Sequence, residues 1–217
     1  MPELLDGLLR DIRACRICRE TPQGGALPHE PRPVLQAGRA APILLAGQAP
    51  GARVHASGKP FTDPSGERLR AWLGVSQEEF YDESLFSIVP MGFCYPGTDA
   101  RGADYPPRPE CRAHWHDRLF ATLPPPQLTL LIGQYAQDYH FARLGLAAFK
   151  SNNLGTTILR WREILAAAPH PVVVLPHPSW RNNGWIRKNP TFENEILPYL
   201  RPKIRTILAP RGADATL

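Results

Sequence analysis

The sequence has no long apolar run and only four cysteines, and these absences narrow its class. No stretch approaches the ~18 apolar residues that a membrane-spanning helix needs, so we expect no membrane partner. The opening segment, MPELLDGLLRDIRACRIC, carries charges throughout. It is therefore unlike a secretory signal peptide and predicts a cytoplasmic protein. No internal repeat or low-complexity segment is visible, so a repeat architecture is not expected.

The composition fits one compact domain. The chain has 217 residues, of which 43% are apolar, enough for a single hydrophobic core over residues 1–217, with 209–217 as a flexible tail. Its 25 prolines are spread between apolar runs, which indicates ordered loops. The net charge of +5 suits a phosphate-bearing partner, although a solvated surface with a small excess of Lys and Arg is the simpler explanation.

Predicted strands and helices alternate along the chain. This order favours a single-domain α/β fold, a three-layer α/β/α arrangement with a central, mainly parallel four-stranded sheet. Apolar runs predict strands at 42–46, 84–91, 128–132 and 172–175. Helical spacing predicts helices at 3–15, 66–73, 77–81, 109–123, 134–144, 156–168 and 192–208, the last with breaks at Pro198 and Pro202.

The segment ILLAGQAPGARVHASGKPFTDPSG, residues 43–66, combines a buried strand with an unusual loop. Its apolar run stops abruptly at Gly47-Gln48-Ala49-Pro50-Gly51, and a helix capped by Asp63 or Ser65 follows. Glycines here would let backbone N–H groups approach a ligand, although such a sequence more often marks an ordinary turn.

Three of the predicted strands end in loops of this kind. The second strand leads into 92–97, Gly-Phe-Cys-Tyr-Pro-Gly, and the fourth leads into His177-Pro178-Ser179. Ligands of open parallel sheets bind beyond the carboxyl ends of the strands. We therefore expect three distant parts of the chain to converge on one crevice.

Taken together, Gly47-Gln48-Ala49-Pro50-Gly51, Gly58-Lys59-Pro60-Phe61 and His177-Pro178-Ser179 resemble the active-site motifs of the uracil-DNA glycosylase superfamily. The sequence is most similar to the iron–sulfur branch, family 4, whose first motif reads GE(A/G)PG and is followed by GxPF. The resemblance spans about Leu8 to Tyr199. It implies a monomeric DNA-repair enzyme that flips uracil out of DNA and hydrolyses its N-glycosidic bond, leaving an abasic site.

The four cysteines form one close pair, Cys15 and Cys18, and two distant residues, Cys94 and Cys111, with 16 residues between them. In a cytosolic protein this pattern suggests metal or cluster ligation, with a structural zinc site or buried free thiols as alternatives. The resemblance implies a [4Fe-4S] cluster held by all four thiolates. The cluster would pin the N-terminal helical segment, 1–20, to the loop after the second strand.

The resemblance also implies roles for residues of the crevice. His177 would donate a hydrogen bond to the uracil oxygen as negative charge builds there, and Phe61 would stack on the base. The backbone N–H groups of Gly47, Gln48, Ala49 and Gly51 would surround the ring. Pro50 belongs to the same loop but has no N–H group. Without the resemblance, a core Phe and a satisfied loop His would be the commoner explanations.

Several positions depart from the superfamily pattern. Ala49 stands where the best-known branch has the Asp that holds the water, and Gln48 stands where the iron–sulfur branch has Glu. Asp63 is a candidate for orienting the water, although a helix N-cap is an equal explanation. We therefore predict His177, Gln48 and Asp63 as the catalytic residues.

Pro90 falls near the position where the branch has the Asn that recognises uracil. Proline has neither an amide side chain nor an N–H group. Recognition would then use backbone atoms of Met91, Gly92 and Phe93, or the side chains of Asn152 or Asn153.

The run after His177 mixes aromatic, basic and amide side chains, which suits DNA. The corresponding superfamily loop enters the minor groove, and either Trp180 or Arg181 is the predicted wedge, although Trp180 or Trp185 could instead pack on the closing helix. Arg187 and Lys188 would clamp phosphates. The predicted DNA-binding residues are Ser179, Trp180, Arg181, Asn182, Arg187 and Lys188.

Other functions stay open at this point. A non-catalytic or weakly catalytic binder of DNA or damaged bases fits Ala49 and Gln48, and a glycosylase for another deaminated base fits Pro90. An enzyme of free nucleosides is less consistent with the Trp180–Lys188 loop. A related branch forms a covalent bond to the sugar through a His in a loop after the second strand, and 98–109 contains no His.

Overall fold

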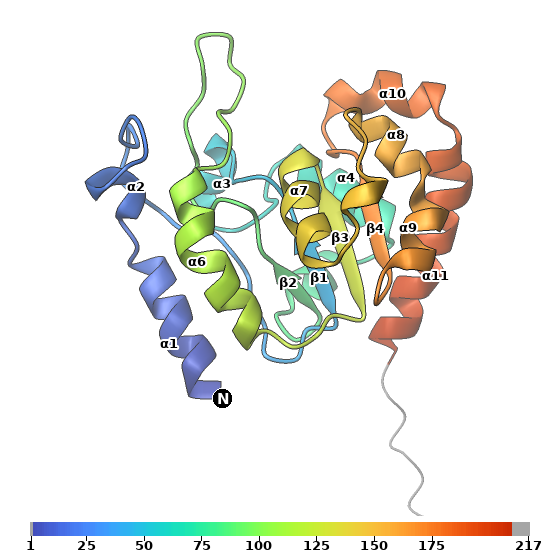
Figure 1. Cartoon of the computed structure of the whole chain (residues 1–217), viewed down its shortest axis with the longest axis horizontal. Helices are drawn as coiled ribbons and strands as arrows, with labels where there is room; N and C mark the ends of the chain where they lie inside the picture. The colour runs from blue at the N-terminus through green and yellow to red at the C-terminus, as the bar shows by residue number, and fades with distance from the viewer. Residues whose placement is uncertain (1, 210–217) are drawn as a thin grey trace, which may run out of the picture.

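The computed structural model describes residues 2–209, which fold around one parallel sheet (Figure 1). The strands are β1 (Ile43–Ala46), β2 (Phe86–Ile88), β3 (Leu128–Ile132) and β4 (Val172–Leu175). They lie in the order β2-β1-β3-β4, and each neighbouring pair is parallel. The predicted α/β class with a central four-stranded sheet is confirmed.

Every residue of the four strands is buried, because helices cover both faces of the sheet. In the central register, Leu45 of β1 lies opposite Ile88 of β2 and Leu130 of β3. Strands buried on both faces read as continuous apolar runs without alternation, which is why the short segments ILLA and VVVL could be recognised in the sequence.

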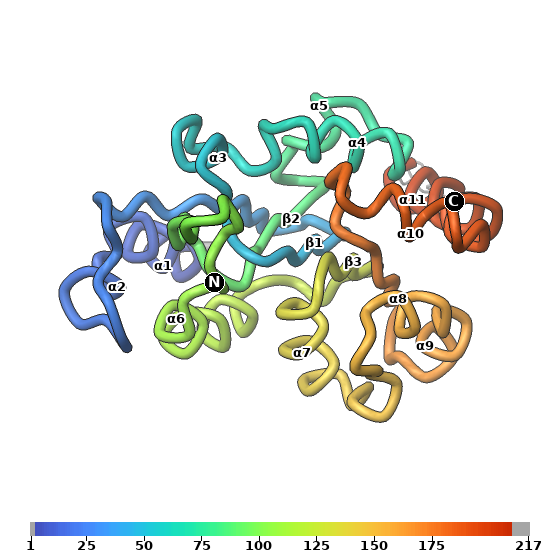
Figure 2. Tube along the Cα trace, turned by 90° about the horizontal axis from the view of Figure 1, so that it is seen from above, coloured from blue at the N-terminus to red at the C-terminus, as the bar shows by residue number. Residues whose placement is uncertain are grey.

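Helices form the two outer layers. In Figure 2, α4 and α5 lie on one face of the sheet, and α6, α7, α8 and α9 lie on the other. The helix α11 packs beside α4. The bounds are α1 Pro2–Arg13, α2 Ile17–Glu20, α3 Ala52–Ser57, α4 Pro64–Leu73, α5 Gln77–Tyr81, α6 Pro109–Thr122, α7 Gln134–Arg143, α8 Leu154–Leu159, α9 Trp161–Ala167, α10 Asn183–Lys188 and α11 Leu197–Leu208. Short 3₁₀ segments cover Ala147–Phe149 and Trp180–Asn182, and a π-helical turn covers Phe192–Ile196.

Some predicted boundaries were wrong. The single helix expected over 156–168 is two helices, α8 and α9, which meet at Arg160. The helix α11 continues through Pro198 and Pro202, where breaks were expected. Pro198 lies in the first turn, where the missing N–H group costs no intrahelical bond. Of the predicted flexible tail, 210–217 lies outside the described residues.

The N-terminal helix packs apart from the main core. One face of α1, formed by Leu5, Leu8, Leu9 and Ile12, is buried in a second apolar cluster together with residues of α6, including Trp115. The predicted amphipathic helix is thus confirmed, and it borders the cysteines. Within residues 2–209, no helix is long and apolar enough to cross a membrane.

Candidate active site

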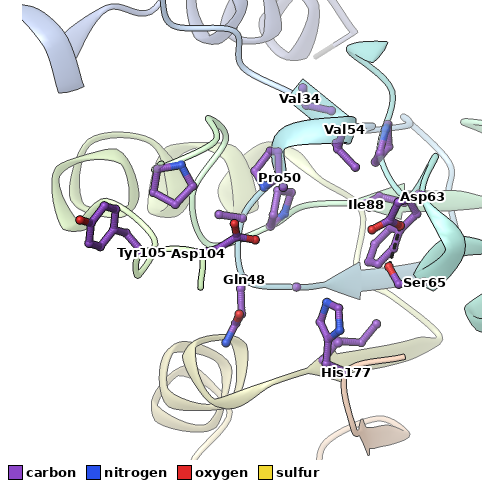
Figure 3. Close-up of a pocket in the computed structure, with 18 residues that line it drawn as sticks. Val34, Gln48, Pro50, Val54, Asp63, Ser65, Ile88, Asp104, Tyr105 and His177 are labelled. Carbon is purple, nitrogen blue, oxygen red and sulfur yellow. Dashed lines mark hydrogen bonds between the residues drawn. The ribbon is translucent and has the colours of Figure 1, made fainter. Parts of the chain in front are cut away.

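A pocket opens beyond the carboxyl ends of the strands, where the crevice was predicted (Figure 3). We call it the strand-end pocket. It collects residues from the loop after β1, the start of α4, the loop between β2 and α6, and the end of β4. The lining side chains used below are those of Gln48, Phe61, Asp63, Pro90, Asp104, Tyr105 and His177.

Phe61 lines the pocket in a strained backbone conformation. Its φ of 54° lies in the left-handed region, which is costly for a bulky residue. The Phe61 carbonyl accepts hydrogen bonds from Tyr81 Oη at 3.1 Å and Arg70 Nη1 at 3.3 Å. A Cβ at Gly66 would clash with this same carbonyl, so the tight turn requires glycine there. The Phe61 ring in turn lies against the backbone of Gly47.

His177 follows β4 directly and is half-buried in the pocket wall. Asn182 Nδ2 donates to the His177 carbonyl at 2.7 Å, which ties the loop down. Burial lowers the pKa of His177 below its usual 6.5, and Arg181 lowers it further, while Asp63 acts in the opposite direction. The imidazole is therefore neutral near neutral pH, and one ring nitrogen carries a hydrogen that can be donated to a ligand.

Asp63 is the N-cap of α4. Its Oδ1 accepts from the Gly66 N–H at 3.2 Å and from Ser65 Oγ at 2.6 Å. The capping explanation is thus confirmed for Asp63, and the carboxylate also lines the pocket next to His177. The catalytic role of Asp63 stays a prediction.

Gln48 lines the pocket, and its side chain lies against Gly133 at the start of α7. In Figure 3 this side chain points away from Asp104. Neighbouring Ala49 and Pro50 bring no polar side-chain atom, so the loop after β1 supplies shape and backbone groups. The catalytic role of Gln48 stays a prediction.

Met91, Gly92 and Phe93 do not reach the pocket, contrary to prediction. The Met91 and Gly92 N–H groups donate to the carbonyls of Gly47 at 3.0 Å and Gln48 at 2.9 Å. They are therefore already used to join the loop after β2 to the loop after β1. Phe93 is buried on the far side, where its N–H donates to Cys111 Sγ at 3.4 Å.

The two asparagines considered for base recognition also lie outside this lining. Asn153 is the N-cap of α8, and its Oδ1 accepts from the Gly155 N–H at 2.8 Å. Asn152 precedes it in the same exposed turn. Pro90 lines the pocket, whereas Met91, Gly92, Phe93, Asn152 and Asn153 are not among its lining residues.

A family model described as Uracil DNA glycosylase superfamily matches residues 36–201. The chain belongs to this superfamily. The match covers the whole sheet and every side chain of the strand-end pocket named above, and it leaves out α1 and α2. Membership makes the protein a DNA-repair glycosylase of uracil or damaged bases, acting in base excision repair.

The glycosylase presents its predicted DNA-binding loop at the mouth of the pocket. The Trp180 side chain is 76% exposed, and Arg181 is exposed beside it. Arg181 is close enough to His177 and Asp104 to lower the pKa of both groups. Arg68 Nη1 donates to the Ser179 carbonyl at 3.3 Å and so fixes the base of the loop.

The two tryptophans of this region differ. Trp185 packs so closely on Gly155 of α8 that a Cβ at the glycine would clash with the indole, and its ring also meets Phe192 edge-on at 6.2 Å between centroids. The packing explanation therefore holds for Trp185, while Trp180 is free for a partner. Arg187 and Lys188 are exposed in the last turn of α10.

The sequence analysis missed Asp104 and Tyr105. They come from a short hairpin, 97–105, closed by a bridge between Thr98 and Asp104 and a bond from the Tyr105 N–H to the Gly97 carbonyl at 2.9 Å. Figure 1 shows the segment between β2 and α6 projecting from the same end of the molecule as α10.

The sequence does contain a signal for the 97–105 hairpin. Asp99 Oδ1 accepts from the N–H groups of Arg101 at 2.8 Å and Ala103 at 2.9 Å, which forms an Asx-type turn. Gly97 begins the hairpin with a φ of 95°, and Gly102 lies in its turn with a φ of 76°. Asp between two glycines at this spacing is typical of a tight turn between paired segments.

The four cysteines of the glycosylase line one small cavity between α2, α6 and the loop after β2. We call it the cysteine cavity. Cys18, Cys94 and Cys111 are buried and Cys15 is half-buried, and all four are free thiols. Among residues 2–209, however, no group of three or more His, Cys, Asp or Glu side chains is arranged to hold a single metal ion.

Two N–H groups point at sulfur in the cysteine cavity. Trp115 Nε1 donates to Cys15 Sγ at 3.1 Å, and the Phe93 N–H donates to Cys111 Sγ. Burial raises the pKa of Cys94 to about 11 and, together with the nearby Glu110 charge, raises that of Cys18 to about 12. N–H donors of this kind stabilise thiolate character that burial alone opposes, so the donor set fits a cationic group bound by thiolates.

Proposed function

We propose that this glycosylase is monofunctional and removes uracil from DNA by flipping the base into the strand-end pocket, leaving an abasic site. The observation that carries the proposal is the presence of Phe61 and His177 in the wall of one pocket. These residues correspond to the aromatic platform and the donor of the two superfamily motifs. The exposed Trp180 and Arg181 next to them suit a polymeric substrate.

The chemistry requires few groups. Uracil stacks on Phe61, and neutral His177 donates a hydrogen bond to a uracil oxygen. As the C1′–N1 bond breaks, its electron pair stays on the base, and the hydrogen bond strengthens with the growing negative charge. A preorganised donor of this type is worth about 10²–10³ in rate. The nearby Asp63 charge raises the pKa of His177, and the nearby Arg181 charge lowers it.

The Trp180 loop would fill the gap that the flipped base leaves in the duplex. An exposed indole can insert between bases, and Arg181 beside it can contact the strand. Arg187 and Lys188 would bind phosphates on the same side, with Ser179 and Asn182 keeping the loop in place through their backbone and side-chain bonds. Since the pocket and loop lie within one chain, a monomer suffices.

We further propose that Cys15, Cys18, Cys94 and Cys111 hold a [4Fe-4S] cluster. Four sulfurs around one cavity and two N–H···S bonds support this assignment. The cluster would act structurally, by fastening α1 and α2 to the loop after β2.

A second candidate is a glycosylase for another deaminated base. The observation that favours it is Pro90, which lines the pocket where the iron–sulfur branch has its uracil-reading Asn. With the Met91 and Gly92 N–H groups already used, the pocket reads the base edge in another way.

A substrate panel tests both candidates. The purified protein, prepared anaerobically, is mixed in excess with oligonucleotides carrying uracil opposite guanine, uracil opposite adenine, uracil in a single strand, or hypoxanthine opposite thymine. Release of uracil in a single turnover supports the proposal, and release of hypoxanthine alone supports the second candidate. Binding to the oligonucleotides without release of any base would refute both and leave a DNA-binding function.

A further inference from the structure

The strand-end pocket contains two carboxylates, and they are held in different ways. Asp63 spends Oδ1 on the Gly66 N–H and the Ser65 hydroxyl, because it caps α4. Asp104 belongs to the exposed 97–105 hairpin, and its side chain is exposed while it lines the pocket. Figure 3 shows Asp104 between Tyr105 and the side of the pocket formed by Asp63 and His177.

The Asp104 carboxylate lies close to the loop after β1. Its Oδ2 is 3.5 Å from the position that a Cβ on Gly51 would occupy. A Cβ at residue 51 would therefore be in van der Waals contact with the carboxylate. Ala49, where the best-known superfamily branch carries its water-holding Asp, belongs to this same loop. The 97–105 hairpin thus places the Asp104 carboxylate beside the loop after β1, in which residues 47–51 include no carboxylate.

We propose that Asp104 is the catalytic residue that orients and deprotonates the attacking water in this glycosylase. In this step the water oxygen forms a bond to C1′ as the C1′–N1 bond breaks. The bond's electron pair leaves with the base, and the water proton passes to Asp104. That proton is then released to solvent or to the departing base anion, so that the products are the free base and an abasic sugar. This inference rests on the proposed function.

The charges around Asp104 suit a general base. Partial burial in the pocket raises the pKa of Asp104, the nearby Asp63 raises it further, and Arg181 opposes the rise. His177 and Tyr105 are further titratable groups in this part of the pocket, and burial keeps His177 neutral. A carboxylate with a raised pKa accepts a proton more readily. Activity should therefore fall as the pH drops through this pKa.

The test is single-turnover release of uracil from a U·G oligonucleotide by Asp104→Asn. We expect a loss of about 100-fold, typical of removing a general base. Asp63→Asn keeps a good N-cap and should lose far less. Asp11→Asn, an exposed carboxylate of α1, is the matched control and should equal the parent.

Two further readouts separate catalysis from structure. Asp104→Asn should bind an oligonucleotide with 2′-fluorinated deoxyuridine, which resists cleavage, at least as tightly as the parent. The fall in the parent's rate at low pH should be absent from the residual rate of Asp104→Asn, and Asp104→Glu should regain part of the activity.

The outcomes distinguish this inference from the proposed function. Parental release by Asp104→Asn would overturn the role of Asp104 while uracil excision stands, and a large loss confined to Asp63→Asn would assign the water to Asp63. Release of no base by the parent itself would refute the proposed function and the role of Asp104 with it.

Discussion

The strand-end pocket and the cysteine cavity both collect residues from distant parts of the chain, yet they differ in burial and in what holds them. The pocket is open, lies beyond the carboxyl ends of the strands, and is lined by exposed residues such as Asp104, with the exposed Trp180 three residues after His177. The cysteine cavity is small, and three of its four thiols are buried next to the separate apolar cluster around α1. The pocket is thus open to a ligand from solvent, whereas a cluster in the cavity, as proposed, would be enclosed by the protein.

The boundary of the superfamily match follows the same division. Residues 36–201 contain every residue of the pocket lining except Val34, but only Cys94 and Cys111 of the four cysteines. Cys15 and Cys18 are brought to the cavity by α1 and α2, which pack on α6. Changes in the cavity should therefore affect folding of the N-terminal segment first, and changes in the pocket should affect chemistry first.

The largest expected effect on stability comes from Cys111→Ser. Loss of a thiolate ligand should remove the cluster, and we expect the free energy of unfolding to fall by roughly 3 kcal/mol or more, because metal-site binding energy is folding energy. Iron and acid-labile sulfide per chain, thermal unfolding, and amide exchange of α1 measure this. Trp115→Phe, which removes only the N–H···S bond to Cys15, should keep the iron. Parental iron content in Cys111→Ser would refute the cluster assignment.

Gly66→Ala should damage the pocket from within its scaffold. The added Cβ would clash with the Phe61 carbonyl, so the turn that sets the strained Phe61 backbone must move. We expect a loss of about 2 kcal/mol in urea unfolding, as for other overpacked sites, and a loss of uracil release. Gly7→Ala in α1 is the control, since its Cβ would meet little and the change should stabilise the helix slightly. Normal uracil release by Gly66→Ala would contradict the platform role of Phe61.

Much of the fold could be predicted because each strand is buried on both faces and is written as a continuous apolar run. The helix α3 was missed because it has only six residues and begins directly at Gly51, within the segment expected to be a loop. No glycine or proline lies next to Arg160, so the division between α8 and α9 depends on tertiary packing.

The candidate site was predicted in part. His177, Phe61 and Asp63 meet in one pocket because strand ends of a parallel sheet share an edge. Met91 and Gly92 do not line the pocket, and only the three-dimensional structure reveals that their N–H groups donate to the carbonyls of Gly47 and Gln48. Asp104 was missed because residues 97–105 show no helical or strand periodicity from which the position of its carboxylate could be predicted.

Trp180→Ala should affect DNA binding and leave stability almost unchanged. Because the side chain is 76% exposed, we expect a change within about 0.5 kcal/mol in unfolding. Loss of a base-stacking indole should cost about 1–2 kcal/mol in binding to a duplex with an abasic site, measured by fluorescence anisotropy. Leu4→Ala, another exposed apolar residue, is the control and should bind normally. Unchanged affinity in Trp180→Ala would transfer the wedge role to Arg181.

The smallest effect is expected from the basic turn of α10. Replacing Arg187 and Lys188 together by alanine removes two phosphate contacts, and the slope of log affinity against log salt should become shallower by about 1.8. Titration of duplex DNA at several salt concentrations measures this slope. Arg10→Ala, an exposed cation of α1, should leave it unchanged. An unaltered slope in the double variant would place the phosphate contacts elsewhere on the molecule.

The most direct test of the central claim, that the strand-end pocket breaks the glycosidic bond of uracil in DNA, is single-turnover uracil release by the parent and by His177→Ala. His114→Ala, a change at an exposed histidine of α6, is the matched control. We predict release by the parent and by His114→Ala, and a rate about 10²–10³ lower in His177→Ala with unchanged thermal stability, as expected for loss of one preorganised donor. Equal rates in the parent and His177→Ala would contradict the account.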